Sequence, residues 1–173
     1  LRQPLKLFGS GLDRYESGNE GRGLVREQLP YDNFNDFAQT ARWQDVMRRH
    51  LAVSLAMGLL DGQKKNFAET FNVLNKIDYL WALRQSDLDN PEAASSKSES
   101  RTWGTLERVY RGTAGSGGAF LKEKVYLEGN IACWRAAETN AEIIEWGDLG
   151  KFDITNPRHI ELAQAMGVLP EAS

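Results

Sequence analysis

The clearest helical signal in the chain is NFAETFNVLNKIDYLWAL at residues 66–83. Asn66, followed three residues later by Glu69, predicts a capping box, in which each side chain accepts a hydrogen bond from the backbone amide of the other residue. Behind this cap, apolar residues recur every three or four positions, which is the period of one helix face. They are Phe67, Phe71, Leu74, Ile77, Leu80, Trp81 and Leu83. We therefore predict a helix over 66–85.

The segment upstream shows the same period. Between Phe34 and Leu59, apolar residues again recur at spacings of three and four, until a turn-forming Asp-Gly pair stops the run. These signals predict one long helix over 32–60, antiparallel to 66–85 because only a few residues join the two. Its N-cap candidates are Asp32, Asn33 and Asn35.

Three further helices are expected downstream. A short helix around 103–110 is closed by Gly112 and the Gly-rich turn that follows. A longer helix covers 120–141, where the apolar residues favour helical over strand spacing. The last helix covers 157–166. Its start and end signals are Asn156, Pro157 and Gly167.

Two segments lack any such period. Residues 1–31 contain five of the sixteen glycines and irregularly spaced apolar residues, so we predict an extended arm. Residues 86–100 are polar and Ser-rich, with too little apolar surface to offset the entropy lost on ordering, so we predict a linker. The expected fold class is mainly α. It is an irregular bundle of about four to five helices in a domain over 32–173, preceded by the long extended N-terminal arm.

Composition excludes several protein classes. The 21 Lys and Arg against 24 Asp and Glu give a net charge of −3, so we do not expect nucleic acid as a partner. With one cysteine, Cys133, and two histidines, neither an intrachain disulfide nor a Cys/His zinc cage can form. The longest apolar run is about half the length that a membrane-spanning helix needs. The compartment stays open, either intracellular or organellar after removal of a targeting segment.

No motif indicates a cofactor, a metal or a catalytic group. Gly112 to Gly117 have the spacing of a phosphate-binding loop, but Gly118 and Ala119 stand where Lys and Ser or Thr are required. Cys133 lies on a predicted amphipathic helix and is expected to be an ordinary buried thiol. We therefore predict no catalytic residue, no cofactor and no metal.

Two groups of residues are candidates for binding. The most basic local feature lies in the predicted helix 32–60, where guanidinium groups could converge on a phosphate, a carboxylate or an acidic patch of a partner. Its members are Arg42, Trp43, Arg48, Arg49 and His50. The second group consists of apolar residues of the arm that could dock along another protein chain. Its members are Leu5, Leu7, Phe8, Leu12 and Tyr15.

The stretch LRQPLKLFG at residues 1–9 resembles the Pro-x-x-Leu-Phe-Gly segment of a motif found in some pre-mRNA splicing proteins. The likeness covers these nine residues only. Residues 10–18 lack the Arg-rich and Leu-rich continuation of that motif, so no family membership follows from it.

The favoured hypothesis is a non-catalytic helical subunit of a larger protein assembly, which uses the arm and the linker for contacts with other chains. Its basis is that both segments bury too little of their own surface to become ordered alone. One alternative is an enzyme that acts on a small anionic molecule near Arg42, Arg49 and His50. Another is a ribonucleoprotein component, which needs a basic stripe that the net charge does not predict.

Overall fold

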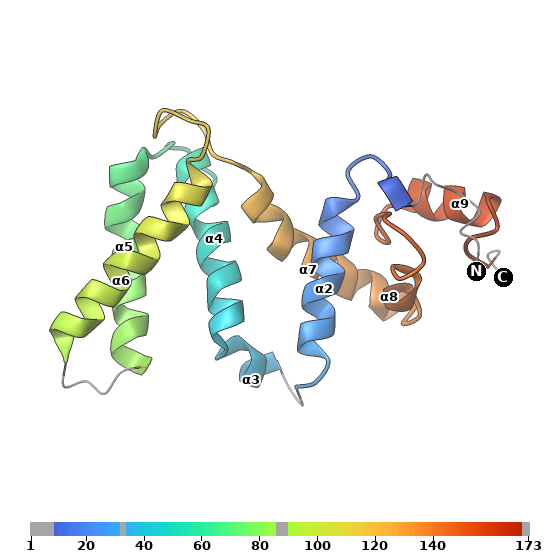
Figure 1. Cartoon of the computed structure of the whole chain (residues 1–173), viewed down its shortest axis with the longest axis horizontal. Helices are drawn as coiled ribbons and strands as arrows, with labels where there is room; N and C mark the ends of the chain where they lie inside the picture. Colours follow the sequence, from blue (N-terminus) through green and yellow to red (C-terminus); the bar gives the residue numbers. More distant parts are fainter. Residues whose placement is uncertain (1–8, 32–33, 86–89, 171–173) are drawn as a thin grey trace. The chain divides into compact units, whose positions relative to one another are not determined.

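The computed structural model describes residues 9–31, 34–85 and 90–170. These residues fold into the helices α2 to α9 and contain no strand, which confirms the mainly α class (Figure 1). They group into two compact units. Unit 1 combines residues 1–39 with 125–173, and unit 2 covers 40–124. This grouping differs from the expected boundary between residues 31 and 32.

Unit 2 contains α4 (Ala41–Met57), α5 (Phe67–Gln85) and α6 (Pro91–Val109), which run side by side (Figure 1). The helix predicted over 66–85 is confirmed as α5. Its capping box is also confirmed. The amide of Asn66 donates to Glu69 Oε2 at 2.8 Å, and the amide of Glu69 donates to Asn66 Oδ1 at 3.0 Å.

The single helix predicted over 32–60 is wrong, because this segment forms two helices, α3 (Phe34–Ala38) and α4. Thr40 has an extended backbone, and its hydroxyl oxygen accepts a hydrogen bond from the amide of Trp43 at 3.2 Å. This side-chain cap starts a new helix. The second helix ends at Gly58, which adopts the left-handed conformation (φ 71°) that glycine allows at low cost.

The linker predicted over 86–100 is wrong for residues 91–100, which form the first half of α6; residues 86–89 lie outside the described residues. Asn90 caps this helix by accepting from the amide of Ala93 at 3.1 Å, and Pro91 stands where its missing amide costs nothing. A buried stripe of small side chains packs α6 into the bundle. Its members are Ala94, Ser98, Thr102 and Thr105.

The core of unit 2 is apolar and draws on all three of its helices. The buried cluster combines small residues of α4 with larger ones of α5 and α6, namely Ala52, Val53, Ala56, Leu74, Leu106, Val109 and Tyr110. The Tyr110 hydroxyl is satisfied inside this cluster, at 2.7 Å from Thr70 Oγ1 and donating to the Lys65 carbonyl at 2.6 Å. The bundle therefore has a closely packed core beneath the side chains on its surface.

Unit 1 contains α2 (Glu16–Gln28), most of α7 (Lys122–Thr139), α8 (Ile143–Trp146) and α9 (Pro157–Ala165). The extended arm predicted over 1–31 is therefore wrong for residues 16–28, and its first eight residues lie outside the described residues. The reason is a glycine-mediated helix contact. Gly21 of α2 and Gly129 of α7 bring the two backbones together, so that α2 packs onto its own unit.

The helices predicted over 120–141 and 157–166 are confirmed as α7 and α9. At the start of α9, the Asn156 side chain accepts from the amide of Arg158 at 3.1 Å, and Gly167 follows the helix with φ 68°. Helices α2, α3 and α8 were not predicted as separate elements. The described residues thus contain eight helices rather than the expected four or five.

Candidate functional site

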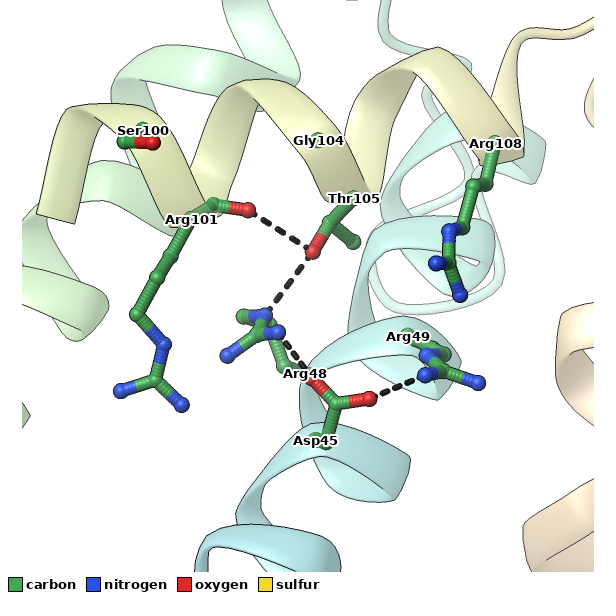
Figure 2. Close-up of a pocket in the computed structure, with 8 residues that line it drawn as sticks. All are labelled: Asp45, Arg48, Arg49, Ser100, Arg101, Gly104, Thr105 and Arg108. Atoms are coloured by element: carbon green, nitrogen blue, oxygen red, sulfur yellow. Dashed lines mark hydrogen bonds and ion pairs between the residues drawn. The ribbon is translucent and has the colours of Figure 1, made fainter. Parts of the chain in front are cut away.

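A groove between α4 and α6, within unit 2, is rich in positively charged side chains (Figure 2). Its volume is about 340 Å³. We call it the basic groove, and its lining residues are Asp45, Arg48, Arg49, Ser100, Arg101, Gly104, Thr105 and Arg108. Four arginines and one aspartate line it, so the lining itself carries a surplus of three positive charges.

Arg48 is the most buried charged side chain of the groove, with 5% of its surface exposed. Its Nε donates to the hydroxyl of Thr105 at 2.9 Å, and its Nη2 donates to the carboxylate of Asp45. Its Nη1 lies 3.7 Å from Asp78 Oδ1 and makes no hydrogen bond to any described residue. Arg48 is therefore fixed in position by α6 and by its own helix.

Asp78, on α5, is the fully buried counter-charge behind Arg48. Its Oδ2 accepts from the hydroxyl of Thr102 at 2.7 Å. Burial raises the pKa of Asp78, although the Thr102 hydrogen bond and the positive charge of Arg48 oppose that rise. Burial likewise lowers the pKa of Arg48, against the opposing effect of Asp78.

Arg49 is held by two carboxylates. Its Nη2 donates to Asp45, and its Nη1 donates to Glu123 Oε2 at 3.4 Å. Asp45 therefore bridges two arginines, using one oxygen for each. These pairs compensate much of the charge that α4 contributes to the groove.

Arg101 and Arg108 differ from the arginines of α4, because neither guanidinium forms a hydrogen bond or ion pair with any described residue. Both extend from α6 toward α4, at the two ends of the groove (Figure 2). They are seven residues apart, so they share one helix face and are separated by about 10 Å along the axis. Gly104 lies between them, and a Cβ at this position would meet no atom within 4 Å.

The structure thus brings together two of the five basic-cluster residues predicted from the sequence. Arg48 and Arg49 line the groove, whereas Arg42, Trp43 and His50 do not. The sequence interpretation missed Arg108, because nothing local in the sequence shows that this arginine faces α4. It missed Arg101 because the helix predicted around 103–110 leaves it out. The signal was present in Asn90 and Pro91, the same Asn-Pro pair that correctly predicted the start of α9.

The predicted arm residues are placed differently. Leu5, Leu7 and Phe8 lie outside the described residues. Leu12 packs against the apolar core of unit 1, and its amide donates to the Lys151 carbonyl at 3.0 Å. Tyr15 is half-buried, with its ring over Gly11. Leu12 thus packs within its own unit.

The groove offers binding groups but no pair of nucleophile and base. Its lining contains no histidine or cysteine, and Asp45 is held by two guanidiniums. Cys133 is fully buried in unit 1, where burial raises the pKa of its thiol to about 12. Among the described residues, no cluster of His, Cys, Asp or Glu is placed to hold a metal ion. No helix in that part of the chain is long and apolar enough to cross a bilayer.

Comparison with protein-family models, curated proteins and solved structures finds no match for this chain. Its function is therefore inferred from the geometry and charge of its own residues.

Proposed function

We propose that this chain is a non-catalytic helical subunit of a protein assembly, and that the basic groove docks an acidic segment of a partner protein. The observation that carries the proposal is the pair Arg101 and Arg108, whose guanidiniums form no ion pair with any described carboxylate, although Arg101 feels the charge of the buried Asp78. A guanidinium presents paired N–H donors that match a carboxylate in two-point geometry. The site is thus complementary to carboxylates supplied from outside.

Charge is distributed unevenly between the two units. Residues 40–124 contain thirteen Lys and Arg against ten Asp and Glu, a surplus of three positive charges. The rest of the chain contains eight Lys and Arg against fourteen Asp and Glu, a surplus of six negative charges. The net charge of the whole chain is therefore small although unit 2 is positively charged. A positive charge on unit 2 favours its encounter with an acidic surface.

The proposal places the partner contact on α6 rather than on the arm. Within the arm, α2 packs inside unit 1, so its apolar residues are used internally. The second half of the predicted linker, by contrast, is helical and supplies Ser100 to the groove. The role of Leu5, Leu7 and Phe8 in partner binding stays a prediction.

Binding is favoured over catalysis because the hydroxyl groups of the groove have no base beside them. Thr105 donates its hydroxyl proton to the Arg101 carbonyl at 3.0 Å and accepts from Arg48. Ser100 has no imidazole or uncommitted carboxylate among the lining residues. Activation of a hydroxyl nucleophile requires such a base.

The test is a titration of the whole protein with a short oligoglutamate peptide at low and at physiological salt. We expect the variant Arg101→Ala/Arg108→Ala to bind about tenfold more weakly than the wild type, or worse, because two charged contacts are lost. The matched control is Arg84→Ala, which removes an exposed arginine of α5 outside the groove. Equal affinity of the double variant and the wild type would refute the proposal.

The two alternatives give different results in the same experiment. Single-stranded RNA that binds more tightly than oligoglutamate, with affinity that falls steeply with salt, would favour a ribonucleoprotein component. Binding of a small dianion with no measurable affinity for oligoglutamate would favour a small-molecule site.

A further inference from the structure

Basic residues on α6 form a continuous stripe. Lys97, Arg101, Gly104 and Arg108 follow one another at spacings of four, three and four, so they lie on one face of the helix. Lys97 and Arg108 are exposed and Arg101 is half-buried. We call these four residues the α6 stripe.

The acidic residues of α6 lie away from this stripe. They are Glu92, Glu99 and Glu107. Each residue advances about 100° around an α-helix, which puts all three at least a quarter-turn from the centre of the stripe. Trp103 is also on that other side, where its indole Nε1 donates to Glu107 at 2.9 Å. The basic and acidic residues of α6 therefore lie on different faces of the helix, and all charged residues of the stripe are cations.

The spacing of the stripe matches a helix better than an extended chain. Arg101 and Arg108 are separated by about 10 Å along α6, the distance between residues seven apart on a second helix lying alongside. An extended chain covers about 10 Å in three residues, but its side chains alternate, so residues three apart point to opposite faces. Of the two, the helix is the conformation that presents two acidic side chains at this separation on one face.

Gly104 allows such a helix to come close. It stands midway between the two arginines and has no side chain, and the space that its Cβ would enter is open. Ser100, the other groove residue on this side of α6, is also small. Small residues at the centre of a helix face let a partner backbone approach while long charged residues close around it.

From these observations we infer that the acidic segment docked in the basic groove is an α-helix that presents carboxylates seven residues apart to the α6 stripe. This inference rests on the proposed function and names the class of partner. Helices that bind helices are anchored by residues at spacings of three, four and seven, as on the stripe. Glu or Asp side chains then pair with Arg101 and Arg108, and a small partner residue faces Gly104.

A protein helix fits the stripe better than a nucleic acid does. A phosphate backbone is held by many cations in succession, and affinity scales with their number. The stripe has three cations, which is few for holding a long polyanion. The exposed aromatic ring on α6, Trp103, lies on the other side of the helix, where it cannot stack bases over the stripe.

The experiment uses two end-capped, Ala-based helical peptides of identical composition. In the facing peptide the glutamates are seven residues apart, and in the scattered peptide they are five apart and spread around the helix. We expect the facing peptide to bind the whole protein about tenfold more tightly than the scattered peptide, because only the facing peptide forms both ion pairs together. Equal affinities would overturn the inference.

The variant Gly104→Leu tests whether a partner helix comes close to α6, without changing the charge of the stripe. This variant keeps every charge of the stripe and places a bulky side chain in open space, so folding is expected to be preserved and is checked by circular dichroism. We expect about tenfold weaker binding of the facing peptide and unchanged binding of the flexible oligoglutamate. Unchanged binding of the facing peptide would refute close helix docking.

The outcomes distinguish the two proposals. If all three peptides bind equally well and all depend on Arg101 and Arg108, the helical partner is wrong and the acidic docking site stands. If no peptide depends on these arginines, the proposed function itself fails. Displacement of the facing peptide by single-stranded RNA at equal charge concentration would overturn the choice of a protein partner.

Discussion

Gly21 and Gly129 bring the backbones of α2 and α7 into direct contact. A Cβ on Gly129 would lie 3.2 Å from the Cα of Gly21 and 2.9 Å from the carbonyl carbon of Ser17. A Cβ on Gly21 would lie 2.6 Å from the amide nitrogen of Asn130. Because these obstacles are backbone atoms, no rotamer change can make room for a side chain.

Gly21→Ala is therefore expected to destabilise the protein. Overpacking of this kind costs about 1–3 kcal/mol in free energy of unfolding. The matched control is Gly23→Ala on the same helix, where the added Cβ meets no atom within 4 Å. The control is expected to gain up to about 1 kcal/mol, since alanine favours a helix over glycine. Urea unfolding followed by circular dichroism measures both, and equal stability of the two variants would contradict a tight helix crossing.

Cys133 reports on the opening of unit 1. Its side chain is fully buried, its thiol donates to the Gly18 carbonyl at 3.4 Å, and burial raises its pKa to about 12. Near pH 8 the thiol is protonated and inaccessible, so it reacts only when the packing around it opens. We expect labelling by a thiol reagent at least about a hundredfold slower than for an unfolded cysteine. Labelling at the unfolded rate would show that α2 does not cover Cys133.

Asp78 makes stability depend on pH in a specific direction. Burial raises its pKa above the ordinary 3.8, so the folded state holds this proton more tightly than the unfolded state does. Its contribution to stability is fully present below the ordinary pKa and is lost as pH rises through the folded pKa. Asn at this position does not titrate. The wild-type free energy of unfolding minus that of Asp78→Asn is thus expected to fall as the pH rises above the ordinary pKa of 3.8.

Urea unfolding of both proteins across that pH range tests this sign. A difference that rises with pH would show that Arg48, at 3.7 Å, outweighs burial and keeps the carboxylate charged. Protonation of other carboxylates affects both proteins alike and cancels in the difference to first order.

The sequence predicts those structural features that depend on residues close together in the chain. Asn66 with Glu69, and Asn156 with Pro157, place the starts of two helices correctly, because a cap involves residues at most three positions apart. The α2 helix escapes prediction for the opposite reason. Its glycines lower helix propensity, and Gly21 becomes favourable only through its contact with Gly129, more than a hundred residues away.

In the candidate site, too, the sequence predicts the residues that are neighbours in the chain and misses those that come together only in the folded structure. The sequence predicts Arg48 and Arg49 as a basic cluster because they are adjacent in the chain. Arg101 and Arg108 lie near them only because α4 and α6 pack together. The carboxylates that compensate the charge of each arginine are also determined in part by the tertiary structure. Asp45 is close in sequence to its two partners, but Glu123 and Asp78 reach the groove from α7 and α5.

Asn90 tests whether the second half of the expected linker owes its helical structure to its cap. Residues 95–100 include four serines, which disfavour helix interiors because their hydroxyls compete for backbone groups. The cap therefore matters more for α6 than for an apolar helix. Asn90→Ala is expected to cost about 1 kcal/mol in free energy of unfolding, and Asn90→Asp, which keeps a capping oxygen, much less.

Loss of the cap also affects the basic groove and the α6 stripe, because fraying of the first turns of α6 releases Lys97 of the stripe and Ser100 of the groove before Arg108. Amide hydrogen exchange in residues 93–100 is expected to accelerate in Asn90→Ala, with little change near the C-terminal end of α6. Asn66→Ala is the matched control, since it removes a cap of the same chemistry from α5. Protection of residues 93–100 that is unchanged in Asn90→Ala and lost in Asn66→Ala would show that packing against α5, rather than the Asn90 cap, orders this part of α6.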